Sequence, residues 1–563
     1  MDRQEITQQY ELWMKNAKED PDLIKEMASW KEEEVREAFY KNLEFGTGGL
    51  RGVIGAGSSR VNIYTVAKAS QGLANYILKQ VPREQRQVAI GYDSRIKSEV
   101  FARTAAEVFA ANGIKAFLFD RLMPTPCVSF AVRSLGCCAG VMVTASHNPS
   151  KYNGYKVYNS QGCQITTSVA DEIFGEIEAL DIFQDVLRLQ FDKAKELGKI
   201  EFIGEEVVTN FIEEVKKQSV LDENTEVDKD VSIVYSSLHG AGLEPVTRVL
   251  RESGYKKVSV VKEQAEPDGT FPTCPYPNPE IEEAMRLGVQ YAEQLKAELF
   301  LATDPDCDRL GVAVKEGEGY TLLTGNEIGV LLFDYICAAR KELGTMPSSP
   351  VMIKTIVTTD MAEKIAQNYA VETINVLTGF KFIGEQIGYM EEEGRENDYI
   401  FGFEESCGYL SGTYVRDKDA VNAAFLTCEM FAFYKTRGIS LSEKLKQLYD
   451  KYGYCLNTLH SYEFEGIQGF EKMKGIMDTF RNGIGEIAGR KTLQVLDYAN
   501  GIDALPKSDV LKYILEADSS FTVRPSGTEP KLKAYLCVRA SCEEEARARE
   551  EEIRLDIEKH LFQ

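Results

Sequence analysis

Short apolar runs alternate with amphipathic stretches through the middle of the chain. An apolar run that begins at Gln87 leads into a polar loop, an amphipathic stretch follows at 101–111, and a second apolar run covers 116–119. The same order recurs from Val231 and again from Val351. This order predicts β-α-β units, which are typical of mostly parallel sheets that helices cover on both faces.

The two ends of the chain follow different patterns. Residues 1–44 are charged, with apolar positions at helical spacing, which predicts helices that pack on the first domain. After Lys451, the segment 458–464 alternates like a strand, 466–490 has a helical pattern, and 543–560 predicts a charged final helix. We therefore predict an α/β protein with three similar mixed α/β domains in series and a smaller α+β C-terminal domain, around one central cleft.

Charged stretches at 196–206, 315–319 and 437–446 indicate the domain boundaries. The expected domains are residues 1–206, which include the helical lead-in, 207–322, 323–445 and 446–563. Ligands of open α/β sheets bind beyond the carboxyl ends of the strands. We therefore expect one loop of each domain to face the shared cleft.

Composition narrows the range of partners and compartments. The 563 residues include 65 basic and 88 acidic side chains, and the net charge of -23 disfavours duplex nucleic acid or an anionic membrane as a general partner. The twelve cysteines form no Cys-x-x-Cys pair, which predicts free thiols in a reducing compartment and excludes zinc fingers and disulfide scaffolds. The N-terminus has no signal region and no apolar run approaches the length that a bilayer requires, so we expect a cytoplasmic protein.

Two loops of the first domain contain candidate polar groups. Ser146 follows a short apolar strand and precedes Asn-Pro and Asn-Gly pairs, which predict turns that expose it. Taken alone, this pattern favours a serine that only satisfies backbone donors of its loop. The segment 45–52 has four glycines around Arg51, which permits close approach to a ligand, although a plain turn explains it equally well.

The second domain contains three alternating aspartates, Asp304, Asp306 and Asp308, directly after an apolar run. Carboxylates that converge at a strand end are costly unless a cation neutralises them, and hard oxygen ligands favour magnesium. A calcium EF-hand requires glycine and glutamate where this chain has Arg309 and Lys315, so that alternative fails. A solvated acidic turn is the remaining alternative.

The third domain contains two loops with short polar groups. Glu404 and Ser406 suit the hydroxyl groups of a sugar, since the carboxylate accepts two hydrogen bonds and the serine both donates and accepts. Thr378 and Gly379 stand in the other loop. A helix cap or a hairpin explains both loops equally well.

The fourth domain contains a candidate phosphate loop. It contains Arg524, Ser526, Gly527 and Thr528 within five residues. A guanidinium fork, two hydroxyl donors and an accessible amide suit a phosphate group, and a structural turn is the alternative.

Four motifs, in this order, resemble those of the α-D-phosphohexomutase superfamily: Thr144-Ala-Ser-His-Asn-Pro, Asp304-Pro-Asp-Cys-Asp-Arg, Glu404-Glu-Ser and Arg524-Pro-Ser-Gly-Thr. The resemblance covers essentially the whole chain after the first forty or so residues. The loop at 45–52 and the segment Asn153-Gly-Tyr-Lys156 are most similar to the phosphoglucomutase and phosphopentomutase branch.

The resemblance implies a reaction and a set of roles. Ser146 is expected to carry a phosphoryl group, and one Mg²⁺ ion is expected between Ser146 and the three aspartates. The phosphoserine would convert a sugar monophosphate to a bisphosphate, which turns and returns its other phosphate. Glucose is the favoured sugar, with glucose 1,6-bisphosphate as intermediate or activator. The resemblance places Arg51, Lys156, Arg309 and Lys418 around the transferred phosphoryl group, the phosphate loop on the second phosphate, and Glu404 and Ser406 on the ring hydroxyls.

The general base that takes the proton of the sugar hydroxyl is left open. Lys156 is our hypothesis, because a lysine beside other cations loses its proton more readily. His147 stays among the catalytic candidates. A serine-hydrolase triad with Ser146 is disfavoured, because neighbouring side chains on an extended segment point apart.

Other functions remain as alternatives. Pentose or mannose phosphates are alternative substrates, and Phe380 replaces a tryptophan or histidine of many relatives, which leaves the sugar preference open. A magnesium-dependent sugar phosphatase and a non-catalytic sugar-phosphate sensor are the alternatives from other classes. Small sugar phosphates are the expected partners, and the sequence predicts no oligomeric state.

Overall fold

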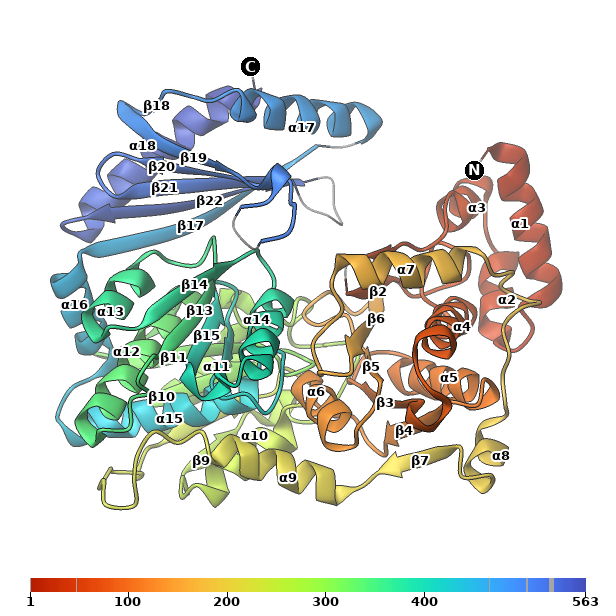
Figure 1. Ribbon diagram of the computed structural model, residues 1–563, viewed down its shortest axis with the longest axis horizontal. Helices are drawn as coiled ribbons and strands as arrows, with labels where there is room; N and C mark the ends of the chain where they lie inside the picture. Colours follow the sequence, from red (N-terminus) through yellow and green to blue (C-terminus); the bar gives the residue numbers. More distant parts are fainter. Residues whose placement is uncertain (1, 47, 465, 503–504, 526–530, 563) are drawn as a thin grey trace.

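The computed structural model describes residues 2–46, 48–464, 466–502, 505–525 and 531–562, and Figure 1 shows their arrangement. Four sheets follow one another along these residues. The first three are mixed sheets flanked by helices, and the last is antiparallel. The predicted order of three α/β domains and an α+β domain is confirmed, and the boundaries at 206, 322 and 445 remain our proposal.

Three helices form over the N-terminal segment with the helical pattern. Asp2 caps the first of them by accepting hydrogen bonds from the backbone amides of Gln4 and Glu5. Trp13 is fully buried and packs edge-on against Phe39. The helices are α1 (Arg3–Asn16), α2 (Pro21–Ala28) and α3 (Glu32–Phe39).

The first sheet has seven strands in the order β1-β2-β6-β5-β3-β4-β7. Strands β5, β3, β4 and the edge strand β7 run parallel, whereas β6 returns antiparallel beside β5. The strands are β1 (Phe45–Gly46), β2 (Gly49–Val53), β3 (Gln87–Tyr92), β4 (Lys115–Phe119), β5 (Ala139–Val143), β6 (Tyr152–Asn159) and β7 (Ile200–Ile203). The helices are α4 (Ile63–Gln80), η1 (Arg83–Gln85), α5 (Ser98–Ala111), α6 (Thr125–Ser134), α7 (Thr167–Glu178) and α8 (Phe191–Glu196).

The second sheet has five strands in the order β12-β11-β10-β8-β9. Strands β10 and β11 form an antiparallel hairpin, and the three aspartates lie in its turn. The strands are β8 (Ile233–Ser236), β9 (Val258–Val260), β10 (Leu299–Thr303), β11 (Leu310–Glu316) and β12 (Gly319–Leu323). The helices are α9 (Glu205–Lys216), α10 (Leu243–Glu252), η2 (Lys262–Gln264) and α11 (Glu282–Leu295).

The third sheet has four strands in the order β14-β13-β15-β16. The turn between β15 and β16 contains the predicted sugar residue Ser406. The strands are β13 (Val351–Thr355), β14 (Glu372–Val376), β15 (Tyr399–Glu404) and β16 (Gly408–Leu410). The helices are α12 (Gly325–Leu343), α13 (Met361–Tyr369), α14 (Phe380–Glu392), η3 (Glu396–Asp398), α15 (Ala420–Thr436) and α16 (Leu441–Tyr452).

The fourth sheet has six antiparallel strands in the order β17-β22-β21-β20-β19-β18. Two helices cover its face away from the other domains (Figure 1) and share a core with the strands. The strands are β17 (Tyr454–Glu463), β18 (Glu486–Ile487), β19 (Arg490–Asp497), β20 (Leu511–Leu515), β21 (Ser519–Pro525) and β22 (Lys531–Ala540). The helices are α17 (Gly466–Arg481), η4 (Tyr498–Asn500) and α18 (Glu543–Phe562).

The helix predicted over 466–490 is too long, because α17 ends at Arg481. Gly483 and Gly489 follow with positive φ, and the β18–β19 hairpin occupies the remaining residues.

The apolar core extends across domains. One buried cluster contains side chains from the first three sheets and their helices, so these domains pack together as one body. All twelve cysteines are free thiols, and Cys542 alone among them is exposed. No helix in the described part of the chain combines the length and apolar character needed to cross a membrane.

Candidate functional site

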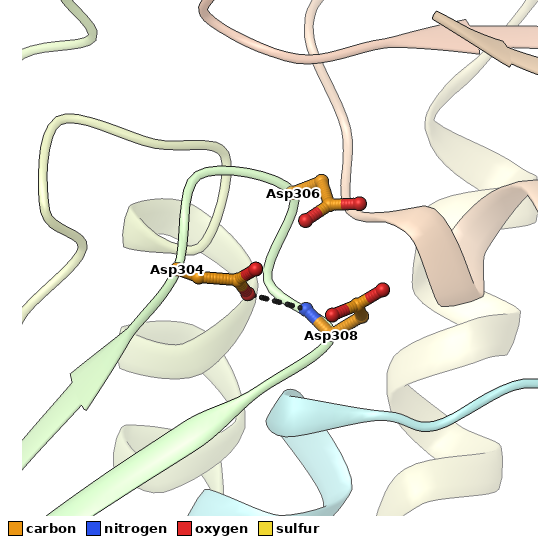
Figure 2. A group of neighbouring side chains, drawn as sticks. All are labelled: Asp304, Asp306 and Asp308. Atoms are coloured by element: carbon orange, nitrogen blue, oxygen red, sulfur yellow. Dashed lines mark hydrogen bonds between the residues drawn. The ribbon is translucent and has the colours of Figure 1, made fainter. Parts of the chain in front are cut away.

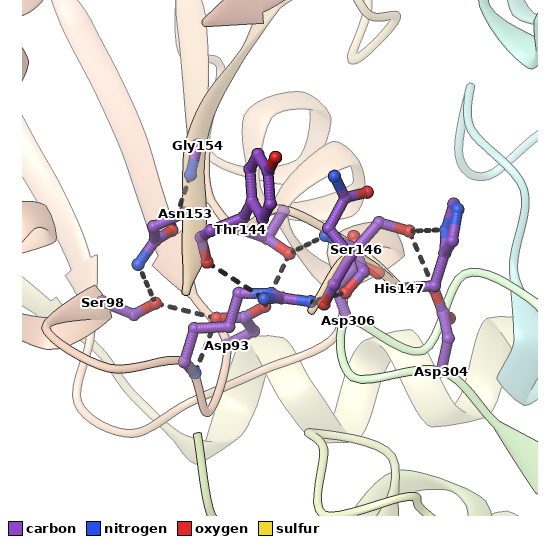
Figure 3. Close-up of polar contacts among 12 residues, drawn as sticks. Asp93, Ser98, Thr144, Ser146, His147, Asn153, Gly154, Asp304 and Asp306 are labelled. Atoms are coloured by element: carbon purple, nitrogen blue, oxygen red, sulfur yellow. Dashed lines mark hydrogen bonds and ion pairs between the residues drawn. The ribbon is translucent and has the colours of Figure 1, made fainter. Parts of the chain in front are cut away.

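Ser146 lies in the loop that joins β5 to β6 and faces the second domain (Figure 3). Its φ of 52° is in the left-handed region, which is uncommon for a residue with a side chain. The Ser146 amide donates to Thr144 Oγ1 at 2.8 Å, and the Ser146 hydroxyl donates to Asp304 Oδ2 at 2.8 Å. The hydroxyl is therefore directed at the aspartate turn of the neighbouring domain.

His147 contacts the same hydroxyl, with Nδ1 at 3.1 Å from Ser146 Oγ. The expectation that these neighbouring side chains point apart is wrong, because the left-handed conformation of Ser146 replaces the extended one that the argument assumed. Burial and the positive charges of Arg309 and Arg51 lower the pKa of His147 well below its usual range. The ring is therefore neutral at physiological pH.

Asp304, Asp306 and Asp308 form a buried group in the β10–β11 turn (Figure 2), with one oxygen of each within 4.8 Å of the others. Asp304 Oδ1 accepts from the backbone amides of Asp308 and Arg309, both at 3.0 Å, which fixes the turn. Burial and the charges of the other two aspartates raise the pKa of Asp304. Three carboxylates in one buried turn are thus electrostatically unfavourable without a cation.

The donor set fits a divalent metal ion. The Oδ1 atoms of Asp306 and Asp308 are buried and accept no hydrogen bond from the described residues. Such buried acceptors are costly, and carboxylate oxygens are the ligands that Mg²⁺ prefers. The buried aspartate group can therefore hold a metal ion through oxygen atoms that the protein leaves unpaired.

Two lysines provide the local positive charge. Lys156 Nζ lies 2.7 Å from Asp306 Oδ2 and 3.0 Å from Asp308 Oδ2, and Lys418 Nζ lies 3.1 Å from Asp308 Oδ2. Burial lowers the pKa of Lys156, but the two carboxylates outweigh burial and raise the pKa above its usual value. Our base hypothesis assumed cationic neighbours, whereas the groups in contact with Lys156 are carboxylates. The role of Lys156 as a base stays a prediction.

The two arginine candidates occupy different positions. Arg51 lies on β2, and its Nη1 donates to Asn148 Oδ1 at 3.0 Å, so it reaches the Ser146 loop. Arg309 ends the aspartate turn and pairs with Glu280. Both guanidinium groups therefore border the Ser146 and aspartate group.

Glu404 belongs to the same group through Lys418. A Cβ atom on Gly408 would lie 2.6 Å from Lys418 Cδ and 2.8 Å from Glu404 Oε1. Glycine at this position therefore leaves room for the lysine and the carboxylate to approach each other. Ser406 lies in the adjoining turn, and its side chain acts against the burial that raises the pKa of Glu404.

The other predicted substrate residues lie apart from this group or outside the residues that the structure describes. Thr378 and Gly379 precede α14, and no hydrogen bond or ion pair in the described ranges joins them to the Ser146 group. Arg524 lies at the end of β21. The remaining phosphate-loop candidates lie outside the described residues: Ser526, Gly527 and Thr528.

A polar layer beneath Ser146 was not predicted from the sequence. Asp93 Oδ2 accepts from Thr144 Oγ1 at 2.6 Å (Figure 3). Thr125 Oγ1 donates to Asp306 Oδ2 at 2.7 Å. The position of Asp93 was a usable signal, because it directly follows β3, whose neighbour β5 ends beside Ser146. Thr125 gave no comparable signal.

The chain matches three profiles of one family, described as phosphoglucomutase/phosphomannomutase. The α/β/α domains I, II and III of that family match residues 42–182, 209–317 and 324–452. A phosphoglucomutase of Staphylococcus saprophyticus is 37% identical over 541 residues, which are 93% of this chain and 95% of that protein. A phosphoglucomutase of Staphylococcus aureus is 35% identical over 549 residues, which are 95% of this chain and 96% of that protein.

The fold is also similar to a crystal structure. The open form of parafusin, a phosphoglucomutase of Paramecium, aligns with a TM-score of 0.68 and 18% identity, covering 92% of this chain and 96% of that one. At this identity the likeness shows the fold alone.

Proposed function

This chain belongs to the phosphoglucomutase/phosphomannomutase family, and on that premise we propose that it interconverts glucose 1-phosphate and glucose 6-phosphate. It is an isomerase of carbohydrate metabolism that acts by phosphoryl transfer. The observation that carries the proposal is the 2.8 Å contact between the Ser146 hydroxyl and Asp304, which joins the nucleophile of one domain to the metal-binding group of another. We assign the reaction to the cytoplasm as part of this proposal.

In the first half of the proposed reaction, the phosphoryl group moves from Ser146 Oγ to the free hydroxyl of a sugar monophosphate. The P–O bond to Ser146 breaks and a P–O bond to the sugar forms. The hydroxyl proton passes to a base, for which Lys156 remains our hypothesis, and one proton goes to the leaving Ser146 Oγ, so that the serine hydroxyl is restored. Lys418, Arg51 and Arg309 supply positive charge around the phosphoryl oxygens. Mg²⁺ bound by Asp304, Asp306, Asp308 and a phosphoryl oxygen of Ser146 would offset the charge of the transferred group.

In the second half, glucose 1,6-bisphosphate turns and returns its other phosphate to Ser146. Glu404 and Ser406 accept and donate hydrogen bonds to ring hydroxyls in both orientations. Arg524 and the phosphate loop would bind whichever phosphate is not reacting. Thr378 and Gly379 remain candidates for the sugar side of the site.

The test is a comparison of substrates. We expect the highest kcat/KM for glucose 1-phosphate, lower values for mannose 1-phosphate and ribose 1-phosphate, and no steady release of inorganic phosphate. A preference for ribose 1-phosphate would overturn the choice of glucose, and stoichiometric phosphate release would indicate a phosphatase.

A second measurement addresses the role of Ser146. The purified protein is expected to carry phosphate on Ser146, detected by mass spectrometry, and Ser146→Ala should abolish mutase activity. An active Ser146→Ala variant would refute the phosphoserine mechanism.

A further inference from the structure

Arg95 is a buried arginine that binds the backbone of the Ser146 loop. Its side chain is fully buried. Nη1 donates to the carbonyl oxygens of Pro149 and Tyr152, both at 3.0 Å, and Nη2 donates to the carbonyl oxygens of Ser146 and Asn148. Each terminal nitrogen of a guanidinium carries two N–H groups, so these four bonds use all of them on one loop.

The Ser146 peptide units are thereby held from two sides. The Ser146 amide donates to Thr144 Oγ1, and the Ser146 carbonyl accepts from Arg95. Asp93 links Thr144 to Arg95, because its carboxylate accepts a hydrogen bond from Thr144 Oγ1 at 2.6 Å and another from the Arg95 backbone amide at 3.0 Å. A left-handed serine costs of the order of 1 kcal/mol in backbone strain and persists only where its surroundings fix it.

The second domain covers the other side of Arg95. The Phe271 ring centroid lies 5.0 Å from the Arg95 guanidinium carbon, within the range of a cation–π contact. A Cβ atom on Gly269 would lie 2.4 Å from the backbone nitrogen of Ile96 and 2.8 Å from the Arg95 carbonyl carbon. The loop of the second domain therefore packs directly on the Arg95 backbone, which a larger residue at 269 would prevent.

From this arrangement we infer that Arg95 is a positioning residue for phosphoryl transfer. It holds the Ser146 backbone in the left-handed conformation, and it aligns the Ser146 loop with the domain that contains the aspartate group. Nothing places Arg95 against the substrate, so its effect acts through Ser146. The inference rests on the proposed mutase function and adds to it a residue outside the four motifs.

Arg95→Lys tests the inference, because lysine keeps the charge but has three N–H donors and no planar fork. We expect kcat for glucose 1-phosphate to fall about 100-fold, the loss that a misplacement of about 1 Å produces. KM should change less than about threefold, because the sugar-binding side chains are untouched. A single-turnover transfer of phosphate from labelled Ser146 to glucose 6-phosphate should slow by the same factor as kcat.

Arg86→Lys is the matched control. Arg86 stands immediately before the first residue of β3, whereas Arg95 lies beyond the other end of that strand. It also binds backbone carbonyls, those of Val81 and Leu78, at 2.9 and 3.0 Å. Arg86→Lys should lower thermal stability and leave kcat unchanged.

Phe271→Leu is the second test, and it tests the positioning role of Arg95 even if Arg95→Lys does not fold. It removes the aromatic face above the guanidinium while keeping an apolar side chain. We expect kcat to fall about fivefold with KM unchanged, in line with the loss of one cation–π contact.

The outcomes separate the two proposals. A wild-type protein without mutase activity would refute the proposed function. An active wild type whose Arg95→Lys variant keeps kcat within about twofold, or loses kcat and substrate affinity together, would refute the positioning role alone. An equal loss of kcat in Arg86→Lys would also refute it, since any arginine that binds backbone carbonyls would then have the same effect.

Discussion

At the scale of single residues, the site balances buried negative charge with two lysines. Asp308 is the carboxylate that both Lys156 and Lys418 contact. Removing one partner of a buried ionic group leaves the others uncompensated, which costs more than the loss of a surface pair. The effect of each aspartate therefore depends on the partners that it neutralises.

Asp308→Asn is expected to lower mutase activity by about 1,000-fold and to raise the Mg²⁺ concentration needed for half-maximal activity. The substitution removes a proposed metal ligand and the shared partner of two ammonium groups. The measurement is kcat as a function of Mg²⁺ after treatment with EDTA. Asp230→Asn is the control, since Asp230 pairs with Lys257 at the surface. Equal Mg²⁺ dependence in Asp308→Asn and wild type would contradict the metal assignment.

Thr125→Val is expected to weaken Mg²⁺ binding about tenfold, because the Thr125 hydroxyl orients Asp306 through a 2.7 Å hydrogen bond. Isothermal titration with Mg²⁺ measures the change. Thr125→Ser retains the hydroxyl and should bind Mg²⁺ like the wild type. If the serine variant loses as much affinity as the valine variant, the hydroxyl is not the cause.

The sequence predicted functional residues that stand close together along the chain. It did not predict residues whose partners come from distant segments and meet only in the folded protein. The cluster of Asp304, Asp306 and Asp308 was predictable, because residues at alternate positions directly after a strand lie in one turn. Arg95 was not, because its carbonyl partners stand more than fifty residues further along the chain. Backbone carbonyls have no side-chain signature, so no motif reveals an arginine that binds them.

At the scale of elements, the start of helix α15 places Lys418 beside the aspartate turn. Asp419 caps this helix by accepting from the backbone amides of Val421 and Asn422 at 2.8 and 3.1 Å. Burial raises the pKa of Asp419 to about 6, although the Tyr414 hydroxyl and these amides act in the opposite direction. The cap is thus partly protonated near pH 6.

Asp419→Asn is expected to change how stability depends on pH. A carboxyl whose folded pKa lies above its unfolded value stabilises the fold fully below about pH 4, and this contribution is lost as pH rises through 6. The free energy of unfolding of the wild type should therefore fall by about 1 kcal/mol relative to the variant between pH 5 and pH 8. Urea unfolding at both pH values measures this free energy. An equal change in the free energy of unfolding of wild type and variant between pH 5 and pH 8 would contradict the prediction.

The β-α-β units that begin near Gln87, Val231 and Val351 were predictable because their apolar runs are bounded by polar loops. The end of α17 was not read correctly, since apolar positions at helical spacing continue into the glycine-rich segment after Arg481. A glycine with positive φ stops a helix whatever the spacing of its neighbours.

At the scale of the whole molecule, the Ser146 and aspartate group is assembled from three domains, and a partly buried ionic contact links the fourth domain to the third. Asp360 precedes α13 in the third domain and lies 3.1 Å from Lys512 Nζ on β20, and it accepts from Ser520 Oγ at 3.0 Å. Burial raises the pKa of Asp360, but Lys512 and Lys354 outweigh burial and lower it to about 2. Its stabilising charge is therefore present above about pH 4 and is lost as pH falls through 2.

Asp360→Ala is expected to loosen the fourth domain, because it leaves the buried ammonium group of Lys512 without its carboxylate, at a cost of about 3 kcal/mol. Hydrogen exchange of the β20 and β21 amides should become faster at pH 7. Asp509→Asn removes a surface partner of Arg481 in the same domain and should leave exchange unchanged. Unaltered exchange in Asp360→Ala would mean that other contacts hold the domain.

The free thiols have a practical consequence for observing this domain. Cys542 stands just before α18, and it is the exposed member of a set whose other eleven are buried or half-buried. A maleimide fluorophore will therefore label the native chain selectively on its fourth domain, without any engineered cysteine. Its emission and anisotropy during addition of sugar phosphates give a direct optical record of whether that domain changes its surroundings in each turnover.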